Sequence, residues 1–390
     1  MSETIQHANQ AARRAPCISN ALIIGGGVAG LSAAIALSRV GVRCDVVELV
    51  DGPPLGASLG LSGRAADALA ELGIYDACHA TSTPFENDTK AQYLYDATGR
   101  VLSTGPKRPS WPGAKTALGV YRPALAQIME DAARGLGATI RKGITAQTIE
   151  EGDDASWVTL TDGSRRAYEL VIGADGIGSA TRAMVFPEAP APAYSGQISI
   201  RWMLSGPAIE DEGWYASPAG KVGFYHLPEN RIYVPAVLSM PEQKRLSGQE
   251  VHALFSELLD SFTAPAVLEL RRRLTPDSDL ICRPFTWILL PQPWHRGRTL
   301  LIGDAAHATT AHMGMGGGMA IEDAVVLAQC IAGASDLAGA FDSFMARRYE
   351  RVRTVVETSA ALSLLEQDKA PPADSMKLLG AAFETIGQPY

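Results

Sequence analysis

Hydrophobic residues in the first half of the chain form short runs that glycine-rich turns separate. The stretch ALIIGGGVAGLSAAIALSRVGVRCDVVEL (21–49) predicts an apolar strand, a glycine turn, a helix and a second strand, which together make a βαβ unit. Residues 118–150 predict a helix with Pro123 in its first turn and then an extended segment. The stretch WVTLTDGSRRAYELVIGADG (157–176) predicts a hairpin that turns at Asp162-Gly163, followed by an apolar strand.

The middle of the chain has a different pattern, in which aromatic and β-branched residues alternate with polar ones. QISIRWML, KVGFYHLP and RIYVPAVL, all between residues 191 and 283, have the composition of β-strands. After them, RTLLIGDAAH predicts another strand, and GGGMAIEDAVVLAQCI and FDSFMARRYERVRTVVETSAALSLLEQ predict two helices. We expect an α/β fold with a Rossmann-like dinucleotide-binding domain, an interleaved and mainly β-sheet substrate domain, and C-terminal helices.

Shifts in this pattern predict where the domains begin and end. A Pro/Gly loop (GPKRPSWPG) lies near residues 105–115, and PEAPAPA (187–193) indicates a stiff crossover between lobes. We predict a polar leader over 1–19, a discontinuous dinucleotide-binding domain over 20–84, 115–190 and 283–345, a substrate domain over 85–114 and 191–282, and a C-terminal helical segment over 346–390.

Composition narrows the class of protein. The 390 residues carry 34 Lys+Arg against 42 Asp+Glu, and this net charge of -8 gives no indication of a nucleic-acid partner. No apolar run is long enough to span a bilayer, and the first twenty residues lack the apolar core of an export signal. Five scattered cysteines do not suggest a disulfide framework. We therefore expect a cytoplasmic protein without a membrane partner, either a monomer or a homodimer.

The first glycine motif has the context of a dinucleotide site. Gly25, Gly27 and Gly30 fit GxGxxG between a strand and a helix, where bare backbone N–H groups and the helix dipole can meet a pyrophosphate. Glu48 closes the second strand, at the distance expected of an acid that binds a ribose hydroxyl. A strand-to-helix turn without a ligand is the simpler alternative. The motif alone does not distinguish NAD from FAD.

Two further stretches decide between these cofactors. VIGADGIGSATRAMV (171–185) and RTLLIGDAAHATTAHMGMGGGMAIEDA (298–324), taken with GGGVAG, resemble the three fingerprints of the class A flavoprotein monooxygenases, the family of para-hydroxybenzoate and salicylate hydroxylases. The resemblance covers nearly all of residues 20–350. It implies an enzyme whose FAD is reduced by NAD(P)H. The NAD(P)H would bind only transiently, because no second GxGxxG unit is visible in the sequence. It also implies insertion of one oxygen atom of O2, through a flavin C4a-hydroperoxide, into an aromatic or N-heteroaromatic small molecule.

The resemblance also assigns roles to particular residues. Asp304 would reach the ribityl or ribose hydroxyls of FAD, and Arg122 would lie close to the cofactor. Asp175 and Gly176 would lie where the pyrophosphate and the nicotinamide cofactor pass, and Arg182 would hold this segment by salt bridges. The cofactor-binding residues expected are Gly25, Gly27, Val28, Ala29, Gly30, Glu48, Arg122, Asp175, Gly303, Asp304, Gly314, Met315, Gly316 and Gly317.

This chain departs from its relatives at two positions of the third fingerprint. Ala311 stands where a proline is usual, and this change would loosen the loop or enlarge the pocket. Met315 stands where a glutamine is common, so no role of that amide can be transferred. Neither change removes a backbone donor, and the FAD prediction is unaffected.

Polar side chains on the middle strands and on the third fingerprint are candidates for the chemistry. Arg201 is suited to holding a substrate carboxylate, and His226 or His312 to accepting a phenolic proton. Tyr225 and Tyr233 are further candidates. For each of them, a purely structural role is the alternative.

His307, also on the third fingerprint, is expected to support the Gly303-Asp304 turn rather than to contact substrate. Two other functions share the expected fold: an FAD-dependent reductase or dehydrogenase of a lipid or polyene, and a flavin-binding protein without turnover.

Overall fold

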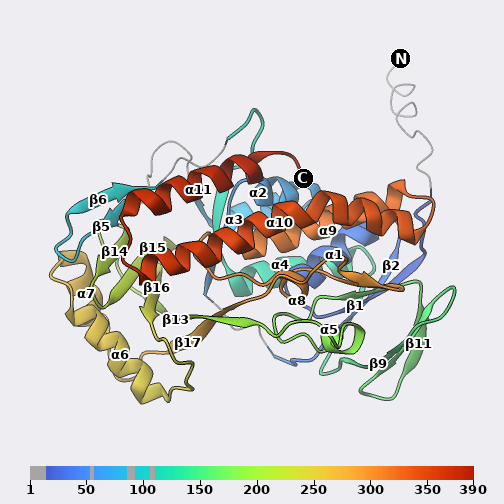
Figure 1. Ribbon diagram of the computed structural model, residues 1–390, viewed down its shortest axis with the longest axis horizontal. Coiled ribbons are helices and arrows are strands. Elements are labelled where there is room, and N and C mark those ends of the chain that lie inside the picture. Colours follow the sequence, from blue (N-terminus) through green and yellow to red (C-terminus); the bar gives the residue numbers. More distant parts are fainter. Residues whose placement is uncertain (1–14, 53–56, 86–92, 106–109) are drawn as a thin grey trace.

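The centre of the molecule is a six-stranded sheet. The computed structural model describes residues 15–52, 57–85, 93–105 and 110–390 (Figure 1), so most of the predicted leader and part of the predicted loop near 105–115 lie outside the described residues. The strand order is β18 (His295–Arg296), β19 (Thr299–Leu301), β12 (Leu170–Gly173), β1 (Asn20–Ile24), β2 (Arg43–Glu48) and β8 (Thr139–Lys142). All neighbours are parallel except β18 and β19.

Two different layers cover this sheet because its central strand is apolar on both sides. Ala21 and Ile23 of β1 face one core, while Leu22 and Ile24 face another. The first core lies under α1 (Val28–Arg39), α2 (Arg64–Glu71), α3 (Tyr75–Ala80), α4 (Arg122–Gly135) and α9 (Gly316–Gly333). The second core lies under a small sheet of β9 (Ala146–Glu150), β10 (Ser156–Leu160) and β11 (Arg165–Tyr168).

A seven-stranded sheet forms the other end of the molecule. Its order is β17 (Leu280–Trp287), β13 (Ala193–Ser205), β16 (Arg231–Ser239), β15 (Gly220–Leu227), β14 (Gly213–Ser217), β5 (Tyr93–Tyr95) and β6 (Val101–Thr104). One face packs on α6 (Gly248–Asp260) and α7 (Pro265–Arg273). A third sheet is made of β3 (Ser58–Leu61), β7 (Ala117–Tyr121) and β4 (Thr83–Phe85).

Helix α10 (Leu337–Gln367) joins the two ends of the molecule. It runs along α9 in the dinucleotide-binding part and reaches β13 of the seven-stranded sheet, and α11 (Pro372–Gly387) packs on it (Figure 1). The two remaining helices are short: α5 (Ala180–Val185) and α8 (Asp304–His307). The boundary predicted between residues 345 and 346 falls inside α10, where the helix continues without a break.

The expected fold class is confirmed, with a dinucleotide-binding sheet and a separate β-rich region. The predicted hairpin is β10–β11, and Gly163 supplies the positive φ of its turn. Helices α6 and α7 were not predicted, although Ser247 and Glu250 form a capping box at the start of α6. The division into domains remains a prediction.

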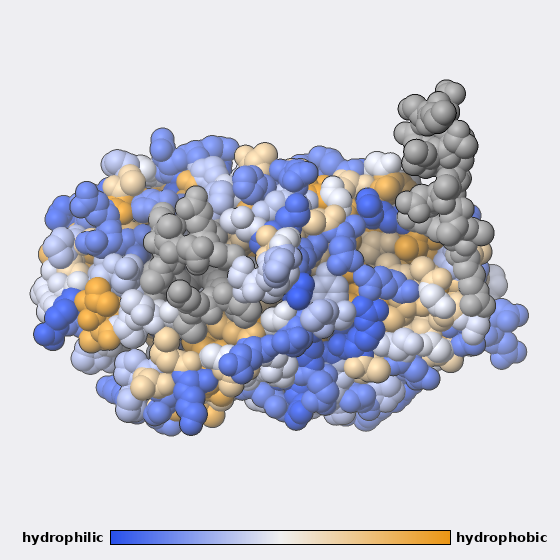
Figure 2. Space-filling view, turned by 90° about the horizontal axis from the view of Figure 1, so that it is seen from above, coloured by the Kyte–Doolittle hydropathy of each residue, from blue (hydrophilic) through white to orange (hydrophobic). Residues whose placement is uncertain are grey.

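The surface on the side of α11 is mostly polar. Seen from the side of α11, hydrophilic residues cover much of the visible surface, with smaller hydrophobic areas among them (Figure 2). Within the described ranges, none of the helices combines the length and the apolarity that crossing a bilayer requires.

Candidate functional site

The three glycine motifs meet at one edge of the central sheet. β1, β12 and β19 are parallel neighbours, and each motif follows the carboxyl end of one of them. A Cβ atom added to Gly25 would lie 2.3 Å from the carbonyl oxygen of Ala174, which precedes Asp175 in the second motif. A Cβ added to Gly303 would lie 2.8 Å from that of Ala29. Backbone contact among the three motifs therefore depends on these missing side chains, and it builds the crevice in which open α/β sheets bind ligands.

The N-terminus of α1 is open toward a ligand. Its N-cap is Gly27, which offers no side-chain cap, and no acidic residue lies in the first turn. A Cβ on Gly27 would meet nothing within 4 Å, whereas one on Gly30 would lie 1.8 Å from the carbonyl oxygen of Gly25. Gly30 thus holds the turn tight, and Gly27 leaves the helix end clear. This arrangement fits the pyrophosphate of a dinucleotide.

Glu48 lies beside this turn, at the end of β2. Its carboxylate accepts hydrogen bonds from the N–H of Gly26 at 2.7 Å and from the N–H of Val50 at 2.8 Å. Each carboxylate oxygen keeps a second lone pair. The carboxylate is therefore fixed at the glycine turn and can still accept a ribose hydroxyl.

Asp304 and Arg122 come together from distant parts of the chain. Asp304 begins α8, and Arg122 begins α4 directly after β7. Asp304 is exposed, and no hydrogen bond within the described ranges engages its carboxylate. The protein around it raises the pKa of Asp304 by desolvation, while the positive charges of His307 and Arg122 oppose this rise. An exposed carboxylate flanked by protein suits contact with ligand hydroxyls.

The third motif ends in a second open helix terminus. Gly314 has a φ of +65°, which favours glycine, and Met315 caps α9 without a side-chain hydrogen bond. Gly316 and Gly317 follow in the first turn. The side chain of Met315 is buried and receives a contact from the Ser62 hydroxyl at 3.8 Å, so it packs inward and leaves the helix end clear.

The structure changes the roles expected of Asp175 and Arg182. The Asp175 carboxylate accepts hydrogen bonds from the Ser179 hydroxyl and from the N–H and hydroxyl of Thr181, both at 2.9 Å. Its side chain therefore stabilises the start of α5, and only its backbone lies against the first motif. Arg182 forms no salt bridge with any residue that the structure describes; it is buried and donates to the carbonyls of Ala305 at 2.8 Å and Ile177 at 2.6 Å. It thereby ties the second motif to the third.

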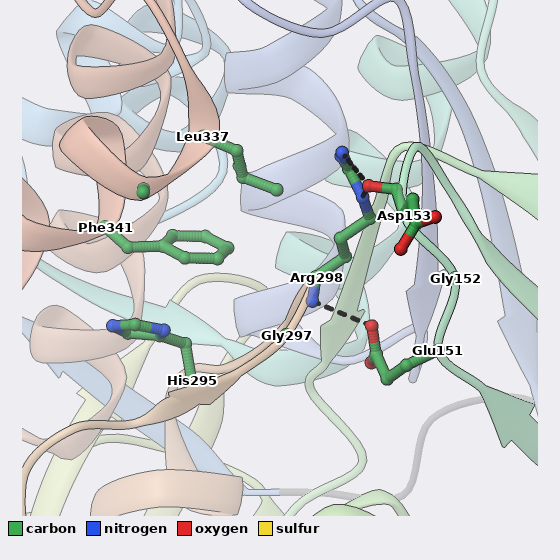
Figure 3. Close-up of a pocket in the computed structure, with 9 residues that line it drawn as sticks. Glu151, Gly152, Asp153, His295, Gly297, Arg298, Leu337 and Phe341 are labelled. Carbon is green, nitrogen blue, oxygen red and sulfur yellow. Dashed lines mark hydrogen bonds between the residues drawn. The ribbon is translucent and has the colours of Figure 1, made fainter.

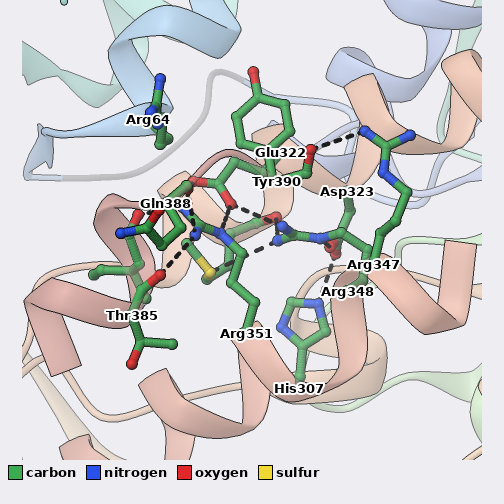
Figure 4. Close-up of polar contacts among 12 residues, drawn as sticks. Arg64, His307, Glu322, Asp323, Arg347, Arg348, Arg351, Thr385, Gln388 and Tyr390 are labelled. Atoms are coloured by element: carbon green, nitrogen blue, oxygen red, sulfur yellow. Dashed lines mark hydrogen bonds and ion pairs between the residues drawn. The ribbon is translucent and has the colours of Figure 1, made fainter. Parts of the chain in front are cut away.

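A buried ion network supports the third motif from behind (Figure 4). The Asp323 carboxylate accepts from the N–H of Gly303 at 3.0 Å, from Nε2 of His307 at 2.6 Å and from Nε of Arg348 at 2.8 Å. Although burial opposes the charged form, the charges of His307 and Arg348 hold the pKa of Asp323 at about 2. The expected supporting role of His307 agrees with this geometry.

The same network reaches the C-terminal segment. Glu322 binds Arg348 at 2.8 Å and Arg351 at 2.7 Å. Arg351 also donates to the carbonyls of Gln388 at 3.0 Å and Ile386 at 2.5 Å (Figure 4). We call Glu322, Asp323, His307, Arg348 and Arg351 the Arg348 network. Each of its two carboxylates is paired with at least one arginine, as buried charges require.

One face of the seven-stranded sheet carries three of the substrate candidates. Ile200, Trp202, Phe224 and Val234 pack on α6 and α7, so the alternation of strands turns Arg201, Tyr225 and Tyr233 to the opposite face. Tyr225 and Tyr233 are cross-strand partners. Burial raises the pKa of Tyr233, and the charge of Arg201 opposes this rise.

The face that carries Arg201 is turned toward the third motif. Phe285 of β17 contacts the His312 ring at 5.4 Å between centroids, and Lys221 of β15 pairs with Glu366 of α10. No hydrogen bond to Arg201 occurs among the described residues, so its guanidinium is available to a ligand.

His226 lies outside this site, which corrects its prediction as a base. It shares the face of Val222 and Phe224, whose other neighbours are α6 and α7. Its Nδ1 lies 2.7 Å from Glu212, and its Nε2 accepts from the N–H of Ile209 at 3.1 Å. Both ring nitrogens are therefore occupied locally, and the role is structural.

His312 lies on the third motif, but it points away from the open surface. Its side chain is only 3% exposed. Burial, together with the charge of Lys221, lowers the pKa of His312 to about 3, so the imidazole is neutral. A ring this deeply buried does not fit direct contact with a substrate, which corrects that part of the prediction.

A separate cavity of about 450 Å³ lies beside Gly297 and Arg298, which precede β19, whereas the third motif follows that strand (Figure 3). Glu151, Asp153, His295, Arg298 and Phe341 are among its lining residues. Arg298 donates to the Asp153 carbonyl at 2.7 Å and to the Glu169 carbonyl at 3.1 Å. Its guanidinium is thus committed to the fold, and the cavity lies apart from the glycine motifs.

Sequence reasoning missed three residues on or beside the sheet face that carries Arg201: Trp214, Lys221 and Glu366. The ammonium group of Lys221 lies 5.0 Å from the ring centroid of Trp214 and pairs with Glu366. Strand alternation could have placed Trp214 and Lys221 beside Tyr225, since all three share one face. No local signal marks Glu366, which enters from the distant end of α10.

Comparison with known proteins agrees with this geometry. The model of the family described as "FAD binding domain" matches residues 19–359. The aurachin C monooxygenase/isomerase of Stigmatella aurantiaca is 31% identical over 89% of both chains. The 2-heptyl-3-hydroxy-4(1H)-quinolone synthase of Pseudomonas aeruginosa is 31% identical over 85% of this chain and 86% of its own.

A solved structure also matches nearly the whole chain. A variant of HpxO from Klebsiella pneumoniae, complexed with FAD, superposes with a TM-score of 0.78 at 25% identity, covering 95% of this chain and 94% of its own. The three glycine motifs described above all lie within the matched range of the family.

Proposed function

This chain belongs to the FAD binding domain family and is a flavoprotein monooxygenase, and we propose that NAD(P)H and O2 are its co-substrates in hydroxylating an electron-rich ring. The observation that carries this proposal is the meeting of three glycine motifs at one sheet edge, with His312 of the third motif in contact with Phe285 of the sheet that carries Arg201 and Tyr233. A cofactor cradle and a polar, aromatic wall then lie on two sides of one site.

We assign the cofactor contacts from the open positions of the cradle. The first turn of α1, Gly27 to Gly30, would hold the pyrophosphate, and Glu48 a ribose hydroxyl. Asp304 and Arg122 would bind hydroxyl and phosphate oxygens nearer the middle of FAD. The backbone N–H groups from Gly314 to Gly317 would face the pyrimidine edge of the flavin ring.

Bound FAD supplies the redox chemistry, by taking a hydride from NAD(P)H and activating O2 for transfer to the substrate. The chain itself holds the ring and excludes water. Tyr225, Tyr233 and Trp214 provide an aromatic wall, which suits a flat ring. No second glycine-rich dinucleotide unit occurs in the sequence, so the nicotinamide cofactor would bind transiently.

The charges on this wall favour a particular substrate chemistry. Arg201 has no hydrogen-bond partner among the described residues, whereas Lys221 is neutralised by Glu366. A free guanidinium suits a carboxylate or a ring oxyanion. We therefore propose an aromatic or N-heteroaromatic substrate that carries an ionised or ionisable oxygen, as the name of the quinolone synthase also suggests. The lipid or polyene reductase and the flavin protein without turnover are not favoured by these relatives.

The test is oxidation of NADH and NADPH by the FAD-loaded protein across a panel of hydroxybenzoates, phenols, hydroxypyridines and hydroxyquinolines. We expect one ring class to stimulate oxidation without matching release of hydrogen peroxide, and an oxygenated product to form. Stimulation accompanied by stoichiometric peroxide and no product would contradict the hydroxylase proposal. A cytoplasmic location and a monomeric or homodimeric state also remain proposals.

A further inference from the structure

One row of residues crosses the seven-stranded sheet on the face of Arg201. Arg201 of β13 lies opposite Pro235 of β16, and Gly223 of β15 lies opposite Trp214 of β14. The register between β15 and β16 places Gly223 opposite Pro235. The order along the row is therefore Arg201, Pro235, Gly223 and Trp214. Because neighbouring strands lie about 4.8 Å apart, the backbones at the two ends of the row are about 14 Å apart.

The two middle residues of this row have little side-chain bulk. Gly223 has no side chain, and Pro235 has only its ring. The neighbouring rows on the same face carry larger side chains: Tyr233 and Tyr225 on one side, and Val237 and Lys221 on the other. The row therefore leaves most room over Pro235 and Gly223, between the guanidinium at one end and the indole at the other.

The indole of Trp214 fills the part of this room that lies over Gly223. A Cβ atom added to Gly223 would lie 2.9 Å from Cδ2 and 3.1 Å from Cε3 of the indole. The ammonium group of Lys221 lies 5.0 Å from the indole centroid, and the ring of Tyr225 meets the indole edge-on at 6.3 Å between centroids. The indole is thus held in place from both directions along β15, and its position depends on the missing side chain of Gly223.

The cofactor cradle contacts this face of the sheet at two places along β13. Phe285 contacts the ring of His312, which belongs to the third motif. The guanidinium of Arg231 lies 4.7 Å from the ring centroid of Tyr121, the residue before Arg122, and strand alternation puts Arg231 on the same face. The row described above lies between these two contacts. A substrate that binds along it would therefore lie between the sheet and the cradle.

We propose that Trp214 determines substrate size by closing the end of the substrate site opposite Arg201. This inference rests on the proposed function, in which Arg201 binds the ionised oxygen of an aromatic ring. A ring anchored there extends over Pro235 until it meets the indole that covers Gly223. The substrate is then a compact ring system without a long group on the side away from its ionised oxygen.

Binding to the FAD-loaded protein tests this inference without turnover. The probes are the panel compound that binds most tightly, found by the change in flavin absorbance, and its derivatives with a methyl, butyl or heptyl group on the ring atom farthest from the ionised oxygen. The heptyl derivative should bind at least about tenfold more weakly than the methyl derivative. In Trp214→Ala this ratio should fall below about threefold, because alanine leaves the space over Gly223 open.

Trp214→Phe separates a limit on substrate size from a general loss of structure. Phenylalanine keeps a flat ring of smaller area, so the ratio should lie between those of the unchanged protein and Trp214→Ala, with FAD content unchanged. The inference is overturned if the unchanged protein binds both derivatives equally, or if its ratio persists in Trp214→Ala.

Trp157→Ala is the matched control. Trp157 lies on β10, outside the seven-stranded sheet, and is 46% exposed. This variant removes an indole of the same size and should leave the ratio unchanged. If the panel yields no oxygenated product, the proposed function fails, while the binding ratios still decide the role of Trp214. If no panel compound binds to the unchanged protein or to Trp214→Ala, both proposals fail.

Discussion

Two buried polar clusters lie along the same helix, and they differ in how completely their hydrogen bonds are satisfied. In the Arg348 network, Asp323 and Glu322 accept from two arginines, a histidine and a backbone N–H. Around His312, toward the other end of α10, three buried atoms have no hydrogen-bond partner among the residues that the structure describes. Each kind suits a different task. A satisfied network holds a loop in one place, whereas an unsatisfied one leaves polar atoms for ordered water to bind.

The largest effect should come from breaking the satisfied cluster. Arg348→Met would leave Glu322 and Asp323 buried with fewer positive partners, and we expect a loss of about 3–5 kcal/mol in the free energy of unfolding. Urea denaturation of the FAD-loaded protein measures it. Arg353→Met is the control, because Arg353 pairs with Glu350 on the surface and its loss should cost under about 1 kcal/mol. Equal effects of the two substitutions would show that the network adds nothing beyond a surface pair.

Next in size is the loss of the cofactor contact that the network supports. Asp304→Ala should weaken FAD binding by about ten- to a hundredfold, since a hydrogen bond to a charged group is worth about 1.5–3 kcal/mol. Flavin fluorescence on dialysis measures the affinity. Asp260→Ala, which removes an exposed carboxylate from α6, should leave FAD content unchanged. Normal flavin occupancy in Asp304→Ala would refute the assignment of this motif.

The dependence of stability on pH should separate the two clusters. The pKa of Asp323 is lowered from 3.8 to about 2, so its contribution is complete above about pH 4 and is lost as the pH falls toward 2. The pKa of His312 is lowered from 6.5 to about 3, so stability should fall as the pH drops from 6.5 toward 3. One proton corresponds to a slope of about 1.4 kcal/mol per pH unit.

Urea denaturation at a series of pH values tests this separation. His312→Asn should flatten the curve between pH 6.5 and 4, within the interval set by the two pKa values of His312. Asp323→Asn should change mainly the part below about pH 4. An unchanged slope in His312→Asn would mean that its ring is not buried in the neutral form.

The smallest effect is expected from replacing His226, which was predicted to lie in the site but lies on the other face of the sheet. His226→Asn should change kcat less than about twofold, because both ring nitrogens bond locally on the face that packs on α6 and α7. Steady-state turnover measures it. A large loss in kcat with normal stability would return His226 to the list of candidate bases.

Much of the cofactor cradle could be predicted from the sequence, because its signals are local. The glycines of the first and third motifs lie within short segments, and each follows a strand whose apolar run is unmistakable. Glu48 was found by its spacing from the same motif. Helices α6 and α7 were missed because the strands around them dominate the hydrophobic pattern of this region. Ser247 and Glu250 nevertheless form a capping box, which marks the start of α6.

The residues of the substrate side were predicted less well. Whether a side chain reaches this side depends on the sheet face to which it points, and spacing in the sequence does not reveal that. His226 and Tyr225 are adjacent in sequence, yet strand alternation sends them to opposite faces. Asp175 was predicted as a cofactor contact from its place in the second motif. Ser179 and Thr181 hydrogen-bond to its carboxylate instead, and only the three-dimensional structure shows this. Glu366 reaches the site from 54 residues beyond His312, as their numbers in the chain show.

The uninterrupted course of α10 sets the rotational phase between the two halves of the enzyme. Arg348 and Glu366 stand on one rigid helix, and each added residue would turn the later part by about 100° and advance it by about 1.5 Å. A single inserted alanine between them would swing Glu366 away from His312 while the earlier half stayed in place. The number of residues between Arg348 and Glu366 therefore matters as much as their side chains. We expect evolution to change this number only by nearly whole helical turns.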